Sequence, residues 1–142
     1  IEDAYEIEIA VLGNDQPIAS VPGELIACNE FYDYKAKYLD GDSELIIPAQ
    51  LPEIVVKRLQ YCAVETFRAL DCAGLARVDF LVRKQSHKIF VLEANTLPGF
   101  TPISMYPKLW KASGIPYTEL ISRLIDLALE RHQDQQQIRR LN

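Results

Sequence analysis

The chain has 142 residues, of which 49% are hydrophobic and 25% are charged, a composition typical of one globular domain with a core of its own. Its formal net charge of -5 provides no general attraction to nucleic acid or to an anionic membrane surface, which argues against both as partners. Three widely spaced cysteines without a C-x-x-C pair predict neither a disulfide framework nor a zinc site, and no apolar run is long enough to span a membrane.

Two strands are expected in the N-terminal region. The chain begins at Ile1 without an initiator Met, which leads us to expect a piece of a longer protein, and no signal peptide is visible in it. Residues 5–13 alternate apolar side chains with Glu6 and Glu8, which predicts a strand whose glutamates face solvent. A turn leads to a second strand over residues 18–28, interrupted at a Val-Pro-Gly sequence.

Residues 29–41 combine four aromatic side chains with two lysines, an unusual density for a loop. A flat ring can stack on a base, and an ammonium group can neutralise a phosphate, so this composition suits a nucleotide. The alternative is hydrophobic cover, with the lysine stems lying along apolar surface.

A short strand and a long helix are expected next. Residues 44–48 favour the strand, and Pro52 suits the first turn of the helix. Apolar residues then recur at steps of three and four as far as Leu70, and the Asp-Cys-Ala-Gly sequence at 71–74 is expected to end the helix. This helix packs against the sheet, and we assign it no chemistry.

The central motif is a predicted antiparallel hairpin. Residues 75–82 and 88–95 are rich in Val, Ile, Phe and Leu, and a polar turn separates them. Such runs are typical of strands that are buried on both faces. Polar residues inside these strands therefore need partners.

Four polar residues interrupt the hairpin. A loop of three residues would place Asp79 opposite Glu93 and Arg77 opposite Asn95, all on one face. Two carboxylates about 4 Å apart repel by about 4 kcal/mol at an effective dielectric of about 20, so a cation is expected between them. Arg77 and a divalent metal are both candidates, and the hard oxygen donors favour Mg²⁺ over Zn²⁺. A solvated acidic hairpin with an Arg–Asp pair is the alternative.

The loop that follows is stiff and rich in hydrogen-bond donors. Residues 96–104 contain two prolines, Gly99 and three hydroxyl groups, which suits the docking of an anionic substrate beside a bound cation. The alternative is an ordinary connection between elements. Ser104 has no histidine near it in sequence to act as its base, so we interpret it as a hydrogen-bond donor to substrate, or else as the cap of the next helix.

Two helices are expected at the C-terminal end. Residues 107–113 predict a short helix closed by Gly114, and Thr118 can cap a last helix. Residues 132–142 are rich in glutamine and have no apolar period, which predicts a frayed end.

Several of these motifs resemble a known family. The sequences Arg-Val-Asp-Phe at 77–80, Glu-Ala-Asn-Thr-Leu-Pro-Gly-Phe at 93–100 and Thr-Pro-Ile-Ser at 101–104 are similar to the C-terminal part of the ATP-grasp fold in D-alanine–D-alanine ligases. The similarity extends back to residues 31–38 and 6–13, so it covers almost the whole chain.

This resemblance implies a fold and a reaction. The fold would be α+β, an ATP-grasp C-terminal lobe over residues 1–131 with a mostly antiparallel sheet and packed helices, followed by a polar tail over residues 132–142. ATP would phosphorylate the carboxylate of one D-alanine, and the amine of a second would attack the acyl phosphate, giving D-alanyl-D-alanine for peptidoglycan precursors. The implied setting is the bacterial cytoplasm, with a homodimer as the complete enzyme.

The resemblance also implies catalytic and metal-binding roles. One or two Mg²⁺ ions, or Mn²⁺ in their place, would be held by Asp79, Glu93 and Asn95. Arg77 and the main-chain N–H of Gly99 would stabilise the oxyanion of the tetrahedral intermediate. Ser104 would anchor the carboxylate of the second substrate.

The implied ATP site draws on residues from four segments. Glu6 would hold the ribose, Phe31 would lie against the adenine, Lys37 would contact phosphate, and Leu92 would also line the site. Because this fold clamps ATP between two lobes, and the residues of the other lobe would precede Ile1, we expect the chain alone to bind Mg-ATP weakly or not at all and to have no ligase activity.

Two alternatives remain open. The same fold could use another acceptor, such as D-lactate or D-serine. The chain could instead be a non-catalytic binding module, but such a module would not need Arg77, Asp79, Glu93 and Asn95 together.

Overall fold

The computed structural model describes residues 3–26 and 44–141, with the backbone alone for residues 138–141. The strands are β1 (Ala4–Gly13), β2 (Ile18–Ala19), β3 (Gly23–Ile26), β4 (Glu44–Ile46), β5 (Gly74–Arg83) and β6 (Ile89–Asn95). The helices are α2 (Glu53–Ala69), α3 (Met105–Ala112) and α4 (Tyr117–Leu141). The expected α+β architecture is confirmed.

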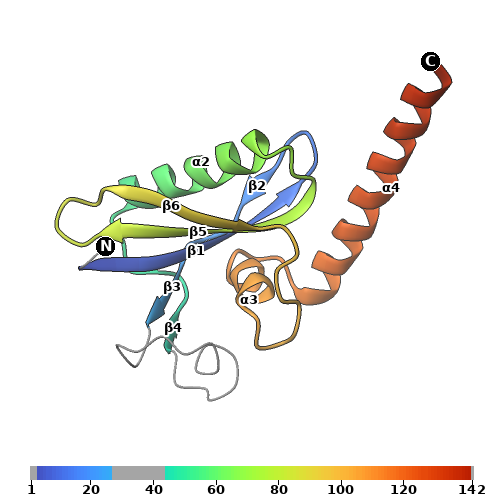
Figure 1. The fold of residues 1–142 in the computed structure, drawn as a ribbon. Coiled ribbons are helices and arrows are strands. Elements are labelled where there is room, and N and C mark those ends of the chain that lie inside the picture. The colour runs from blue at the N-terminus through green and yellow to red at the C-terminus, as the bar shows by residue number, and fades with distance from the viewer. Residues whose placement is uncertain (1–2, 27–43, 142) are drawn as a thin grey trace.

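One antiparallel sheet forms the centre of the molecule (Figure 1). Its strands lie in the order β4-β3-β1-β5-β6, and the short β2 also pairs with β1. The two long strands β1 and β5 pair along their whole length, from Ala4 opposite Arg83 to Gly13 opposite Gly74. Because side chains alternate along each strand, this pairing gives the sheet two faces of different character.

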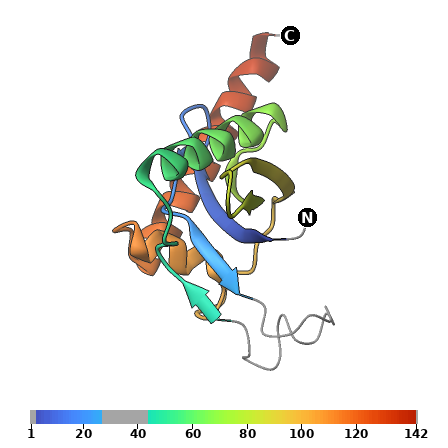
Figure 2. The same cartoon turned by 90° about the vertical axis from the view of Figure 1, so that its left-hand side faces the viewer.

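Helix α2 covers one face of the sheet (Figure 2). Its buried residues are Val55, Leu59, Ala63 and Phe67, which recur every four positions and form one apolar stripe. The stripe packs on inward side chains of β1 and β5, among them Ile9 and Phe80. Fully burying an apolar side chain of this size contributes about 1.5–3 kcal/mol, so this layer is a major source of stability.

Helix α3 and the first part of α4 pack against the opposite face. Tyr106, Leu109 and Trp110 of α3 form a second cluster with Ala10 and Leu12 of β1. The Tyr106 hydroxyl donates a hydrogen bond of 3.0 Å to the carbonyl oxygen of Val11, which ties α3 to the sheet. Burial raises the pKa of the Tyr106 phenol above its usual value, so the group stays a neutral donor.

The two C-terminal helices differ from expectation at their ends. Helix α3 begins at Met105 rather than Pro107, and Thr118 lies inside the first turn of α4 instead of capping it. The expected frayed end after His132 is wrong, because α4 continues to Leu141 and projects away from the sheet (Figure 1). Among the described residues, no helix is both long and apolar enough to cross a membrane.

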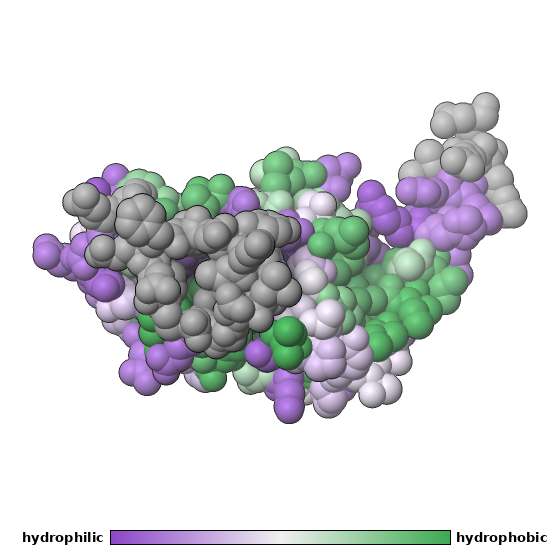
Figure 3. All heavy atoms as spheres, turned by 60° about the horizontal axis from the view of Figure 1, so that its bottom comes forward, coloured by the Kyte–Doolittle hydropathy of each residue, from purple (hydrophilic) through white to green (hydrophobic). Residues whose placement is uncertain are grey.

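Helix α4 exposes apolar side chains along its first part. Ile121, Ile125 and Leu129 are 38%, 55% and 56% exposed and recur every four residues. Figure 3 shows hydrophobic surface beside the first turns of α4 and hydrophilic surface toward its far end. The helix is therefore amphipathic where it leaves the body of the molecule.

Candidate functional site

The candidate site lies on the sheet face opposite α2. Ile7 and Ile9 of β1 point toward α2, so Glu8 between them must point the other way, as must Asp79 between Val78 and Phe80 of β5. Glu8 and Asp79 are paired across β1 and β5, and paired residues share a face.

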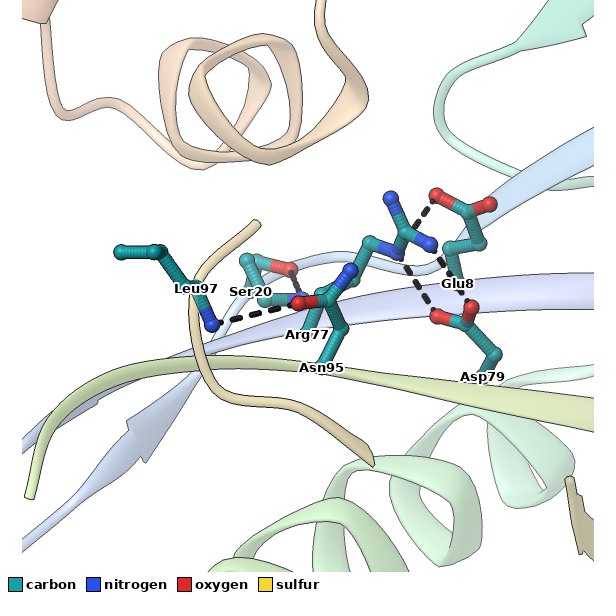
Figure 4. A network of polar contacts seen from close by, with 7 residues as sticks. Glu8, Ser20, Arg77, Asp79, Asn95 and Leu97 are labelled. Carbon is teal, nitrogen blue, oxygen red and sulfur yellow. Dashed lines mark hydrogen bonds and ion pairs between the residues drawn. The ribbon is translucent and has the colours of Figure 1, made fainter. Parts of the chain in front are cut away.

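One guanidinium group bridges two carboxylates on this face (Figure 4). The Nε and Nη2 atoms of Arg77 donate hydrogen bonds of 2.8 Å to Oδ1 and Oδ2 of Asp79, a bidentate pair. The same Nε atom lies 3.1 Å from Oε2 of Glu8. Glu8, Arg77 and Asp79 are only 3%, 7% and 1% exposed. The expectation that Glu8 faces solvent is therefore wrong, because Arg77 holds it in the interior.

The expected register of the hairpin is confirmed. Asp79 pairs with Glu93, and Arg77 pairs with Asn95. The reason is different from the three-residue loop that we expected. Nearer the turn, Phe80 pairs with Val91, and an irregularity between Asp79 and Phe80 shifts the register at that point. The shift leaves Leu92 as an extra residue, a bulge that restores the expected pairing.

Within the described residues, strand β6 lies at the edge of the sheet and its central residues are exposed, so the expectation that it is buried on both faces is wrong. Glu93 is exposed, and Leu92, expected to line the ATP site, is 55% exposed. Asn95 is half-buried, and its Oδ1 atom accepts a hydrogen bond of 3.1 Å from the main-chain N–H of Leu97 (Figure 4). The side-chain oxygens of β6 are thus more accessible than those of Asp79.

The donor set suits a hard cation. Asp79, Glu93 and Asn95 offer carboxylate and amide oxygens from paired positions on one face, the chemistry that Mg²⁺ prefers. Within the described ranges 3–26 and 44–141, no three His, Cys, Asp or Glu side chains form a metal-holding group. Each Asp79 oxygen accepts one hydrogen bond from Arg77, so a metal at Asp79 would share this carboxylate with the guanidinium.

The loop after β6 brings two further candidate residues together. A Cβ atom added at Gly99 would lie 2.9 Å from Oγ of Ser104. The Ser104 hydroxyl accepts a hydrogen bond of 3.0 Å from the Thr101 N–H and lies 2.8 Å from the Thr101 hydroxyl. Ser104 occupies the N-cap position of α3, but its side chain makes no cap hydrogen bond, so it organises this loop instead.

Aromatic contacts fix the same loop to the body of the molecule. The ring of Phe100 lies 5.8 Å from that of Tyr106 and 5.4 Å from that of Tyr117, measured between centroids. The Tyr117 hydroxyl also donates a hydrogen bond of 3.0 Å to the carbonyl oxygen of Phe100. The main chain around Gly99 is therefore held from both α3 and α4.

Of the three remaining expected site residues, Glu6 is in the described part of the chain and two are not. Glu6 is half-buried, and strand alternation puts it on the same face as Glu8. Phe31 and Lys37 lie outside the described residues. Glu8 was missed by the sequence reasoning, because alternation placed it on the face opposite Ile7 and Ile9 but did not identify Arg77 as its partner.

The antiparallel sheet with helices packed on it superposes on the ATP-grasp fold of solved ligases. Residues 1–126 match the family model described as D-ala D-ala ligase C-terminus. The chain therefore belongs to the D-alanine–D-alanine ligase family.

Individual relatives agree with this assignment. The D-alanine–D-alanine ligase of Acetivibrio thermocellus is 60% identical over 129 residues, which cover 91% of this chain and 34% of the relative. The ligase structure from Coxiella burnetii superposes with a TM-score of 0.84 and 44% identity, covering 97% of this chain and 35% of that one.

Two further structures bear on ligands. The VanG D-Ala:D-Ser ligase of Enterococcus faecalis has a TM-score of 0.76 and 36% identity, over 87% of this chain and 36% of that one. A Bacillus anthracis ligase complexed with ATP has a TM-score of 0.73 and 30% identity, over 92% of this chain and 41% of that one. This chain spans about a third of the length of the curated relatives that it matches.

Proposed function

We propose that this chain is the C-terminal part of an ATP-dependent ligase that joins two D-alanines into D-alanyl-D-alanine for peptidoglycan precursors. The observation that carries the proposal is the paired placement of Asp79 with Glu93 and of Arg77 with Asn95 on one sheet face. The 60% identity to the Acetivibrio thermocellus ligase supports the choice of reaction.

In this proposal Asp79, Glu93 and Asn95 are the metal ligands. They would hold one or two Mg²⁺ ions, or Mn²⁺ in their place. The bound metal would neutralise phosphate charge during phosphoryl transfer. Glu93 is the most exposed of the three, whereas Asp79 is buried. ATP as a cosubstrate is supported by the ATP complex of the Bacillus anthracis relative.

The residues around the loop would act on the developing charge of the acyl intermediate. Arg77 can present its Nη atoms to an oxyanion, and the Gly99 N–H lies on a main chain that aromatic contacts hold in place. Ser104 would bind the carboxylate of the second D-alanine, because its hydroxyl lies beside Gly99. A donor that is fixed before the reaction costs little reorganisation when charge develops.

The nucleotide would extend along the same face toward the other end of β1. Glu6 would bind the ribose, with Leu92, Phe31 and Lys37 as further contacts. We place the complete enzyme in the bacterial cytoplasm as a homodimer with no nucleic-acid or membrane partner. For the part that this chain forms, the net charge of -5 provides no general attraction to either partner.

A second acceptor is favoured by one relative. The VanG structure is described as a D-Ala:D-Ser ligase and is 36% identical to this chain, so D-serine is the nearest alternative to the second D-alanine. D-Lactate is the other acceptor to compare.

The test is an acceptor comparison with the full-length ligase. We expect ADP release to require D-alanine and Mg²⁺, with D-alanyl-D-alanine as the product detected by mass spectrometry. A preference for D-serine or D-lactate as second substrate would replace the acceptor but keep the reaction class. ATP hydrolysis that does not depend on D-alanine, D-serine or D-lactate, or no ATP hydrolysis at all, would reject the ligase proposal.

A further inference from the structure

Three charged side chains, Glu8, Arg77 and Asp79, lie buried beside one another on β1 and β5, and the proposed reaction assigns no role to Glu8. Arg77 lies between Asp79, with two hydrogen bonds of 2.8 Å, and Glu8, whose Oε2 is 3.1 Å from the same Nε atom (Figure 4). All three side chains are more than nine-tenths buried. A buried carboxylate is disfavoured unless it is paired, so the position of Glu8 against Arg77 needs a physical reason.

The proposed reaction makes competing demands on Asp79. Each of its oxygens accepts one hydrogen bond from Arg77, and each keeps a second lone pair that could bind the metal. A divalent cation at Asp79 would therefore lie close to the Arg77 guanidinium and draw carboxylate charge away from it. An uncompensated buried charge is strongly destabilising, so metal binding would be weak unless another carboxylate took up Arg77.

We propose that Glu8 is a positioning residue that takes over the Nε side of Arg77 when Asp79 binds the metal, an inference that rests on the proposed function. Glu8 is already within ion-pair distance of the required atom, so the exchange needs a small movement of one side chain. The Nη side of Arg77 is then available for the oxyanion. Glu8 itself touches neither metal nor substrate.

The experiment measures Mn²⁺ affinity by electron paramagnetic resonance in the full-length ligase with ATP present. Glu8→Gln keeps the shape of the side chain but removes its charge. We expect the affinity for Mn²⁺ to fall by about tenfold, a size typical of coupled neighbouring groups, because Arg77 then loses the carboxylate that lies 3.1 Å from its Nε atom. Thermal unfolding of each variant is recorded in parallel.

A matched control is Glu24→Gln. Glu24 belongs to β3 of the same sheet, but its pairing with Ile7 places it on the α2 face. It loses the same charge without touching Arg77, so we expect Mn²⁺ affinity to stay within about twofold of the unmodified enzyme. An equal loss in both variants would show a general charge effect and would overturn the inference.

A double-mutant cycle separates positioning from local charge. In an Arg77→Gln background no guanidinium competes for Asp79, so adding Glu8→Gln should lower Mn²⁺ affinity by less than about threefold. The same tenfold loss in both backgrounds would overturn the inference. Unchanged affinity in Glu8→Gln alone would do so too.

A second measurement covers the case in which Glu8→Gln does not fold. A crystal structure of the unmodified ligase with Mg²⁺ and a non-hydrolysable ATP analogue should place Arg77 Nε on Glu8 and an Asp79 oxygen on the metal. Arg77 still bidentate on Asp79, with the metal held elsewhere, would reject the exchange. Metal affinity does not depend on which acceptor the enzyme uses, so failure of the ligase assay and failure of this inference are distinguishable.

Discussion

Asp79 and Glu93 provide the sharpest test of the site, because they share a proposed role but differ in burial. Asp79 is 1% exposed and carries two hydrogen bonds from Arg77, whereas Glu93 lies exposed on the edge strand. Asp79→Asn and Glu93→Gln each remove one carboxylate charge and keep the side-chain size. In the full-length ligase both should lower turnover by several orders of magnitude.

Asp79→Asn and Glu93→Gln should differ in their effect on the free energy of unfolding. Breaking a buried ion pair from one side costs about 3–5 kcal/mol. Glu8 remains 3.1 Å from Arg77 Nε in Asp79→Asn and keeps part of the compensation, so we expect the lower end, about 3 kcal/mol. Substitutions at exposed positions usually change stability by less than about 0.5 kcal/mol, which is the expectation for Glu93→Gln.

Urea unfolding of the 142-residue chain can measure the difference, because Trp110 is its sole tryptophan and is buried against the sheet. With a slope of about 2 kcal/mol per molar urea, Asp79→Asn should move the midpoint of fluorescence loss down by about 1.5 M. Equal midpoints for the two variants would refute the energetic reasoning about the Arg77 pair. Near-normal turnover in either would remove that residue from the metal set.

Three further outcomes follow from the structure. Gly99→Ala should lower turnover in the full-length ligase by about tenfold or more with a small change in stability, because its Cβ would lie 2.9 Å from Ser104 Oγ and displace the loop; unchanged turnover would exclude a close fit there. The isolated 142-residue chain should release no ADP with ATP and D-alanine, and calorimetry should detect weak Mg-ATP binding or none; D-alanine-dependent ADP release would contradict this. Burial raises the pKa of Glu24 above its ordinary 4.5, so its ionised form opposes folding: Glu24→Gln should stabilise the chain at pH 7, and this gain should disappear as pH falls through the folded and then the unfolded pKa. Urea midpoints at pH 7 and pH 4 check the sign, and a gain that grew on acidification would contradict it.

Periodicity was sufficient for the elements whose packing is simple. Strand β1 and helix α2 occupy the expected segments, because β1 alternates strictly at its start and α2 repeats apolar residues at helical spacing. Both patterns result from contact between one strand face and one helix stripe. The pairing of Asp79 with Glu93 was also expected, but from a three-residue loop, whereas in the structure the bulge at Leu92 produces it.

Other features depended on partners that a linear pattern does not identify. Alternation shows that Glu8 lies opposite Ile7 and Ile9, but it does not show that Arg77 from β5 covers that face. The bulge at Leu92 reflects pairing at an edge strand, which apolar composition alone did not distinguish from a central one. The last part of α4 has no apolar period, yet its Gln and Arg residues have good intrinsic helix propensity and continue the helix.

Glu8, Arg77 and Asp79 are held on their face of the sheet by the apolar residues that flank each of them in its strand. Glu8 lies between two side chains of the α2-facing core, and so does Asp79, so neither can rotate its backbone without exposing a buried neighbour. The stability supplied by α2 is what allows a guanidinium and two carboxylates to be buried on the other face at a net cost. Substitutions on the α2 face should therefore change unfolding first, whereas those on the Arg77 face should change metal binding as well.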